Sequence, residues 1–154
     1  MSPALLTFGT KEDSPPLRFK IFGLGGAGCN LITRSAFPSV AVGSAPHEVD
    51  KCVNSTRLIM SAEELQSYAD IDPGILTPNM LPSDIRNCFY DHDISILTAG
   101  LGGATGSKGI KLFSSASRKM SRGSISIVSM PFSVESENRR KTARETLNDL
   151  TNRS

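Results

Sequence analysis

Two glycine-rich turns, each directly behind an apolar run, constrain the possible folds of this 154-residue chain more than any other feature. The first turn is GLGGAG at residues 23–28, after the run 19–22, and the second is GLGGATG at 100–106, after the run 94–98. Glycine lets backbone N–H groups approach an anion closely, and a helix N-terminus favours negative charge. Two such turns in one small chain indicate two strand-to-helix junctions that face the same phosphate-bearing ligand.

The order of apolar patterns predicts the fold class. Strands are predicted at 17–22, 40–42, 55–60, 94–99 and 124–130, and helices at 29–34, from Ser61, at 83–90, after the second glycine turn and at 138–150. A long ordered loop is expected at 69–82, which is rich in proline. Strands that alternate with helices favour parallel pairing. We therefore expect an α/β fold, a Rossmann-like, mostly parallel sheet of about five strands with helices on both faces.

Length and composition favour one globular domain. The chain lies within the roughly 100–200 residues typical of a domain, and 38% hydrophobic and 21% charged residues are typical of a soluble protein. A net charge of +2 is too small to indicate nucleic acid, and three cysteines without metal-type spacing indicate reduced thiols. We expect a flexible N-terminal tail at 1–16, a folded domain at 17–154, no membrane span and a cytoplasmic location.

The glycine spacing at 23–28 also fits a dinucleotide-binding fingerprint, which needs an acidic residue about twenty positions later to hold a ribose hydroxyl. The nearest acids, Glu48 and Asp50, follow a Pro-His pair and are poorly placed, which disfavours an NAD-dependent oxidoreductase. No Gly-Lys-Ser/Thr follows a four-residue spacer, so a P-loop NTPase is excluded. The Asp-His-Asp sequence at 91–93 is expected to be a solvated turn rather than a metal site.

Three segments resemble the N-terminal GTPase half of the FtsZ/tubulin superfamily. Residues 19–30 (FKIFGLGGAGCN) resemble its first strand and first phosphate loop, including the asparagine that closes the loop. Residues 98–107 (TAGLGGATGS) resemble its signature glycine-threonine loop, which cradles the nucleotide phosphates. The sequence PFSVE at 131–135, with Arg139 four residues beyond, is similar to the loop whose Glu and Arg contact the ribose. The resemblance covers roughly 18–150.

The resemblance implies a GTP- or GDP-binding module of the cytoskeletal or cell-division type, with Mg²⁺ as the accompanying cation. Residues 17–154 are then an incomplete FtsZ/tubulin-like nucleotide-binding domain. The expected partners are a guanine nucleotide and, through self-association or assembly, a fuller homologue, and nucleic acid is not expected. No catalytic or metal-ligating residue is implied. The residues implied to bind nucleotide are Gly25, Gly26, Ala27, Asn30, Gly102, Gly103, Ala104, Thr105, Gly106, Ser107, Pro131, Glu135 and Arg139.

Departures from the family pattern limit the function that the resemblance implies. Ala104 replaces the third glycine of the signature run, and its methyl group is tolerable if its φ is negative. Residues 43–45 (GSA) stand in place of the family's Asn-Thr-Asp pattern. The chain stops before the family's guanine-binding asparagine and its acidic synergy loop, so we expect no efficient GTPase activity from it alone. We also expect its fifth strand to be an open sheet edge. The alternative is a nucleotide-free interaction domain that retains the fold.

Overall fold

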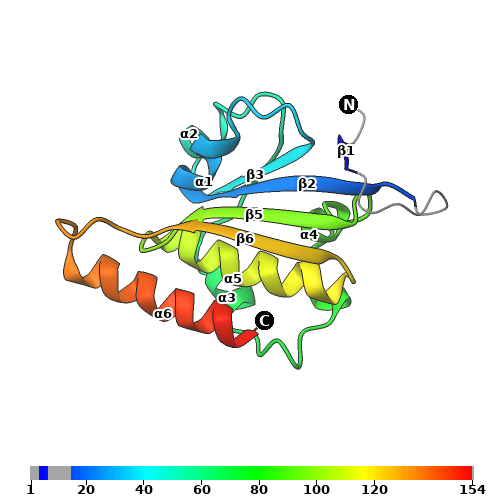
Figure 1. The fold of residues 1–154 in the computed structure, drawn as a ribbon. Coiled ribbons are helices and arrows are strands. Elements are labelled where there is room, and N and C mark those ends of the chain that lie inside the picture. The colour runs from blue at the N-terminus through cyan, green and yellow to red at the C-terminus, as the bar shows by residue number, and fades with distance from the viewer. Residues whose placement is uncertain (1–3, 7–14, 154) are drawn as a thin grey trace.

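The computed structural model describes residues 4–6 and 15–153. Figure 1 shows a central sheet with helices on both of its faces. In chain order the elements are β1 (Ala4–Leu6), β2 (Leu17–Leu24), α1 (Gly25–Ile32), β3 (Ser39–Gly43), α2 (Pro46–Val49), β4 (Thr56–Ile59), α3 (Ala62–Ala69), the 3₁₀ helix η1 (Pro78–Met80), α4 (Ser83–Asn87), β5 (Ile94–Gly100), α5 (Ala104–Lys119), β6 (Gly123–Ser129) and α6 (Glu137–Arg153).

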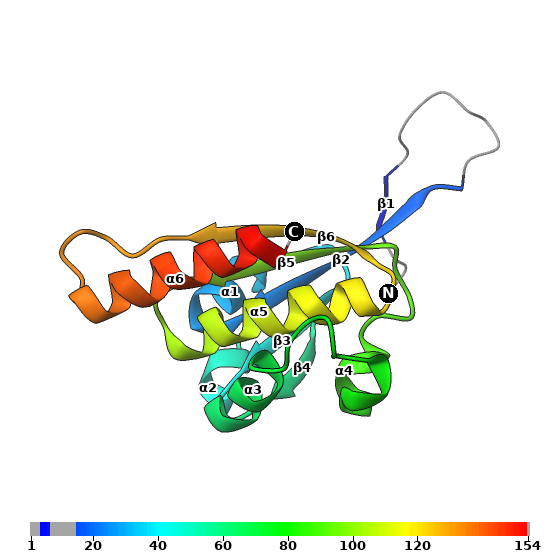
Figure 2. The same cartoon turned by 90° about the horizontal axis from the view of Figure 1, so that it is seen from below.

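The five central strands lie in the order β4-β3-β2-β5-β6, and every neighbouring pair among them is parallel. The predicted Rossmann-like sheet of about five strands is therefore confirmed. The chain runs outward from β2 through β3 to β4, then returns to β5 on the other side of β2. Because parallel crossovers are right-handed, the two directions of travel put their helices on opposite faces. Helices α1 and α2 cover one face, and α3, α5 and α6 cover the other (Figures 1 and 2).

Alternation along β2 supplies both faces of the sheet with core residues. Phe22 and Leu24 belong to a large cluster on the side of α3, α4 and α5, with Phe113 among its members. Ile21 packs instead against a smaller cluster that includes Cys29 and Ile32 of α1. The two glycine-rich turns are thereby fixed at the same end of the sheet, one leading into each helical layer.

Three short elements, β1, α2 and η1, were not expected from the sequence. The segment Ala4–Leu6, inside the predicted tail at 1–16, is a strand that pairs antiparallel with Leu17–Phe19 at the start of β2. The rest of that predicted tail up to residue 14 lies outside the described residues. The short helix α2 follows β3 directly, with Pro46 at its start. The predicted loop at 69–82 contains only η1 beyond the end of α3.

A series of hydrogen-bonded polar side chains is buried at the amino end of β5, where a solvated turn was expected. The imidazole of His92 is 1% exposed, and its Nε2 lies 2.7 Å from Oγ of Ser95. Ser117 of α5 donates to that same Oγ at 3.1 Å, and His92 Nδ1 lies 3.2 Å from the carboxylate of Asp91. The rings of Phe22 and Phe89 pack around His92. The expectation failed for His92 because the rings of Phe22 and Phe89 pack against its imidazole and Ser95 forms a hydrogen bond with it.

Candidate functional site

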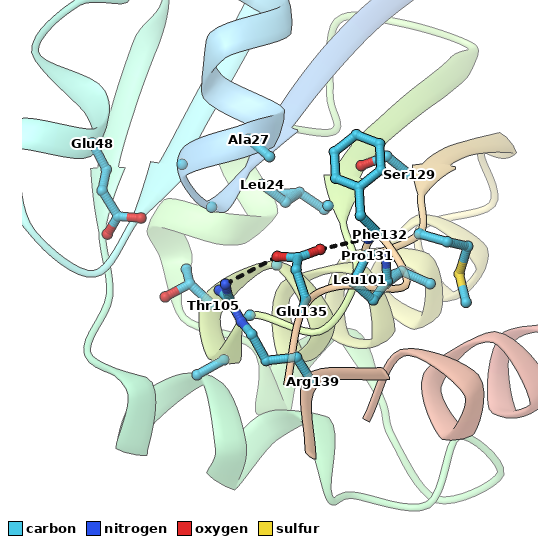
Figure 3. Close-up of a pocket in the computed structure, with 17 residues that line it drawn as sticks. Leu24, Ala27, Glu48, Leu101, Thr105, Ser129, Pro131, Phe132, Glu135 and Arg139 are labelled. Carbon is cyan, nitrogen blue, oxygen red and sulfur yellow. Dashed lines mark hydrogen bonds and ion pairs between the residues drawn. The ribbon is translucent and has the colours of Figure 1, made fainter. Parts of the chain in front are cut away.

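A pocket of about 600 Å³ lies at the carboxyl ends of β2, β5 and β6 (Figure 3). This is the place where the connections from β2 and β5 diverge to opposite faces, which is where open α/β sheets usually bind ligands. The first turns of both α1 and α5 line it. Its lining residues are Leu24, Gly25, Gly26, Ala27, Glu48, Gly100, Leu101, Gly103, Ala104, Thr105, Gly106, Ser129, Met130, Pro131, Phe132, Glu135 and Arg139.

The first glycine turn is shaped mainly by contact with β5 and with the second turn. Helix α1 begins at Gly25, earlier than the predicted start at residue 29, and Gly25 has a φ of +74°. A Cβ on Gly25 would lie 2.9 Å from the backbone N of Gly106, and one on Gly28 would lie 2.4 Å from the carbonyl O of Thr98. Gly26 instead borders the pocket, where a Cβ would meet only the Glu48 carboxylate at 3.5 Å. One glycine of this turn therefore faces open space, and the others permit close packing.

The second glycine turn is fixed by side-chain hydrogen bonds as well as by glycine. Gly102 has a φ of +102°, and its N–H donates to Oγ of Ser107 at 3.0 Å. A Cβ on Gly106 would lie 2.5 Å from the carbonyl O of Gly100. Ser121 is the one non-glycine residue with a positive φ among those the structure describes, so Ala104 carries no left-handed strain. The methyl group of Ala104 is therefore compatible with the loop conformation.

The third predicted segment, after β6, forms the opposite wall of the pocket from Glu48 (Figure 3). The Glu135 carboxylate accepts a hydrogen bond from the Phe132 backbone N–H at 2.6 Å and pairs with Arg139 Nη1 at 3.3 Å. These contacts close a turn that leads into α6. The ring of Phe132 is 78% exposed at the rim of the pocket. This wall of the pocket therefore combines an exposed apolar ring with the ion pair between Glu135 and Arg139.

Glu48 brings a second carboxylate to the pocket, on the side of the first glycine turn. Its Oε1 accepts hydrogen bonds from Ser44 N at 2.9 Å and from Ser44 Oγ at 2.8 Å. Partial burial raises the pKa of Glu48, but the hydrogen bonds from Ser44 and the Ala45 backbone outweigh it and hold the pKa below its ordinary value. Thr105 Oγ1 donates to Ser44 Oγ at 3.1 Å, which links this group to the second glycine turn.

Ten of the thirteen residues that the sequence predicted for the site line the pocket, and Asn30, Gly102 and Ser107 do not. Asn30 is exposed, and its side-chain oxygen accepts a hydrogen bond from Lys51. Gly102 and Ser107 bond to each other within the second turn. Seven other lining residues were not predicted from the sequence, although Gly100 and Ser129 lie at the ends of strands. The residues missed are Leu24, Glu48, Gly100, Leu101, Ser129, Met130 and Phe132.

The charges of the lining residues decide what the pocket can do chemically. Arg139 is its one cationic side chain, whereas Glu48 and Glu135 are anionic. Attraction for a phosphate must therefore come mainly from the N-termini of α1 and α5, whose first-turn N–H groups and dipoles favour anions. The burial of the Cys29 thiol in α1 raises its pKa to about 12, so it is not a nucleophile for this pocket.

Comparison with known proteins supports a distant relationship to cell-division proteins, although no protein-family model matches the chain. The chain is 28% identical over 135 residues to cell division protein FtsZ 1 of Pyrococcus woesei, covering 82% of this chain and 37% of that protein. It is 27% identical over 139 residues to cell division protein FtsZ of Rickettsia conorii, covering 84% and 31%. Over most of its length the chain therefore resembles FtsZ proteins of the FtsZ/tubulin superfamily.

Solved structures of superfamily members have the same fold. An empty FtsZ dimer of M. jannaschii matches with a TM-score of 0.72 at 21% identity, over 92% of this chain and 43% of that one. CetZ from Methanosaeta thermophila matches with a TM-score of 0.67 at 16% identity, over 90% and 43%. The chain thus has the α/β fold of these FtsZ and CetZ structures. It spans about a third of the length of the curated FtsZ relatives.

One further property concerns membranes. Within residues 4–6 and 15–153, no helix combines the length and the apolar character that a membrane crossing requires.

Proposed function

We propose that this chain binds a guanine nucleotide, GTP or GDP, in the pocket at the carboxyl ends of β2, β5 and β6. The observation that carries the proposal is that two helices, α1 and α5, direct their first turns into one pocket. Each of those turns presents one glycine, Gly26 or Gly103, whose Cβ position meets no backbone atom. A phosphate group can therefore approach the backbone N–H groups of both helices.

The proposed orientation follows from the two walls of the pocket. The phosphates lie against residues 25–27 and 103–106, and the ribose lies toward Glu135 and Arg139, as the FtsZ/tubulin resemblance implies. The exposed ring of Phe132 borders that same wall. In this orientation the terminal phosphate points toward Thr105 and the end of β3.

We also propose that the chain hydrolyses its nucleotide weakly when it acts alone. Phosphoryl transfer to water needs a group that orients the attacking water. Glu135 is engaged by Arg139 and the Phe132 N–H, and the hydrogen bonds from Ser44 to Oε1 of Glu48 lower its pKa and make it a weaker base. In the cell we place the protein in the cytoplasm, as a cytoskeletal or cell-division component that associates with itself or with a fuller superfamily member.

Calorimetric titration of the purified chain with GTP, GDP, ATP and NAD in the presence of Mg²⁺ tests nucleotide binding. We expect heat from the guanine nucleotides. Thr105→Val keeps the side-chain shape but removes the hydroxyl, which donates to Ser44 in the free protein and turns to a phosphate oxygen in the proposed complex. It should weaken GTP binding by roughly tenfold or more, the usual loss for a hydrogen bond to a charged group. Thr56→Val is the matched control, because Thr56 is exposed on β4 outside the pocket.

Three other results would contradict the proposal. Binding of none of the four nucleotides would favour the interaction domain that only retains the fold. Preference for NAD would favour the dinucleotide-dependent oxidoreductase. An equal loss of GTP affinity in Thr105→Val and Thr56→Val would mean that the nucleotide binds elsewhere.

A further inference from the structure

The outer strand β6 leaves one side of its backbone unpaired. Within the part of the chain that the structure describes, β6 pairs with β5 alone. On that inner side the Gly123 N–H donates to the carbonyl O of Asp93, and the Ser129 carbonyl O accepts from the Leu101 N–H. The residues at both ends of β6 therefore bond toward β5.

The hydrogen-bonding groups of a strand alternate between its two sides, one residue to each side. Because Gly123 and Ser129 bond toward β5, the residues at even positions direct their N–H and C=O groups outward. These residues are Ser124, Ser126 and Val128. Such a row of backbone groups is a template for another strand.

The two edges of the sheet differ in how they are protected from pairing. The opposite edge strand, β4, spans only Thr56–Ile59 and carries the charge of Arg57. β6 is longer, at seven residues, and contains neither a charge nor a proline. Short edge strands and charged side chains discourage pairing with another chain. β6 is therefore the edge that can accept a partner strand.

The side chains of β6 indicate the chemistry of that partner. Ile125 and Ile127 are 50% and 53% exposed, and Ile125 stands beside Ile96 of β5. On the opposite face, Ser126 lines a groove between β6, α5 and α6 together with Leu147. The strand thus presents an apolar pair on one face, two residues apart. A matching partner strand presents a second apolar pair at the same spacing.

We propose that β6 pairs antiparallel with β6 of a second copy of this chain, about a two-fold axis through Ser126. The strand is self-complementary in this register, because Ile125 then faces Ile127 of the second copy on both sides of the axis. Every outward N–H and C=O group gains a partner. The isoleucines occupy non-hydrogen-bonded positions, where facing side chains lie closest. An axis through Ser124 or Val128 would leave most of the strand unpaired.

This pairing gives a surface for the self-association proposed above and does not depend on nucleotide. The pocket lies at the carboxyl end of β6, where Ser129 lines it. Antiparallel pairing puts the two pockets at opposite ends of the joined sheet. Helix α6 runs alongside β6 (Figures 1 and 2), so the α6 helices of both copies lie on the same face. Leu147, which is 39% exposed, lies near the axis because it lines the groove with Ser126.

Sedimentation equilibrium of the purified chain, without nucleotide, tests the association. We expect the mass to rise from monomer to dimer between about 5 and 500 µM. Ile127→Lys places a charge against Ile125 of the second copy and should raise the Kd of the dimer by roughly tenfold or more. Ile59→Lys is the matched control, because Ile59 is 54% exposed on β4, the other edge. Circular dichroism verifies the fold of both variants.

Disulfide cross-linking tests the register. Ile125→Cys and Ile127→Cys each put one cysteine on the exposed face of β6, whereas the native cysteines Cys29, Cys52 and Cys88 are buried. The proposed register places residues 125 and 127 of different copies about 4.5 Å apart at Cα, which a disulfide can span. With copper-phenanthroline as the oxidant, a mixture of the two variants should cross-link at least about tenfold faster than either variant alone.

Three results would overturn the inference. They are a monomer at every concentration, an equal dimer Kd in Ile127→Lys and Ile59→Lys, and cross-linking of either cysteine variant alone as fast as the mixture. GTP binding by a chain that stays monomeric would retain the proposed nucleotide function while this inference fails. A dimer with the expected behaviour that binds no nucleotide would retain the inference while the nucleotide function fails.

Discussion

The two ends of β5 (Ile94–Gly100) are built in opposite ways. At its amino end, side chains fill the space, with Ser95, His92 and Ser117 in a buried hydrogen-bonded chain beside aromatic rings. At its carboxyl end, side chains are nearly absent, and the backbone of Gly100 meets that of Gly106. Stability and ligand access therefore depend on different structural features in this fold. Side-chain packing closes one end, and bare backbone leaves room for a ligand at the other.

The largest effect that the comparison predicts comes from one methyl group at the carboxyl end. Gly106→Ala would put a Cβ 2.5 Å from the Gly100 carbonyl O, a backbone atom that cannot move without displacing β5 or α5. We expect the free energy of unfolding to fall by about 3 kcal/mol or more. Urea denaturation followed by circular dichroism measures it.

Gly103→Ala is the control for that substitution, since Gly103 lies in the same turn. The nearest atom to its Cβ position is a guanidinium nitrogen of Arg139 at 3.6 Å, and its φ is −80°. We expect a loss of about 1 kcal/mol, because Ala is less favourable than Gly at an N-cap by roughly that amount and its methyl group meets no backbone atom. Equal losses in the two variants would show that close backbone contact does not hold this end together.

A smaller effect is expected at the amino end of β5. Ser95→Ala leaves Nε2 of His92 without its hydrogen-bond partner at a buried position and also removes one of the two acceptors of Ser117. The expected loss of unfolding free energy is about 1–3 kcal/mol, the cost of one unsatisfied buried group. GTP affinity should stay unchanged, in contrast to Thr105→Val. If Ser95→Ala weakened GTP binding as strongly, the two ends of β5 would be coupled and the comparison would fail.

The smallest expected effect is a pH dependence of the unfolding free energy that arises from His92 at the amino end of β5. Burial lowers the pKa of His92 below 6.5, and the charges of Lys20 and Arg122 lower it further, although Asp91 opposes them. Below about pH 6.5 the unfolded chain therefore binds a proton that the folded chain resists, so stability falls as pH falls, by at most about 1.4 kcal/mol per pH unit. Above that pH both states are neutral, and His92 contributes no slope.

Urea midpoints measured from about pH 7.5 down to about pH 5.5 test this dependence. His92→Gln should remove the decline that begins below about pH 6.5. His47→Gln, on the exposed start of α2, should leave it unchanged. A decline of equal size in His92→Gln would assign the titration to another group.

Local sequence pattern was sufficient for most of the fold. Ser61 predicted a helix start, and the structure has a complete capping box there with Glu64. The pattern failed where structure depends on partners distant in sequence. The strand Ala4–Leu6 exists through its pairing with β2, and His92 is buried against the ring of Phe22 of β2. The four-residue helix α2 is too short to show a period.

The candidate site could likewise be predicted from the sequence only in part. Glycine spacing predicted both turns, because a strand followed by glycines and a helix is a local feature. The sequence did not show which glycines face the pocket, since that depends on how Gly25 and Gly28 pack against α5 and β5. Glu48 was set aside because its position after Pro46 looked unsuitable, yet the turn at Ser44 directs it into the pocket. A contact between Thr105 and Ser44 spans 61 residues and has no local signature.

The edge of the sheet has a consequence for the pocket. Among the described residues, the outer side of β6 pairs with no strand, and Gly123–Ser129 contains neither charge nor proline to discourage such pairing. Ser129 ends this strand and also lines the pocket. A further strand that paired with β6 would therefore end beside the pocket. Ser129 is the residue at which the added strand and a bound ligand would adjoin.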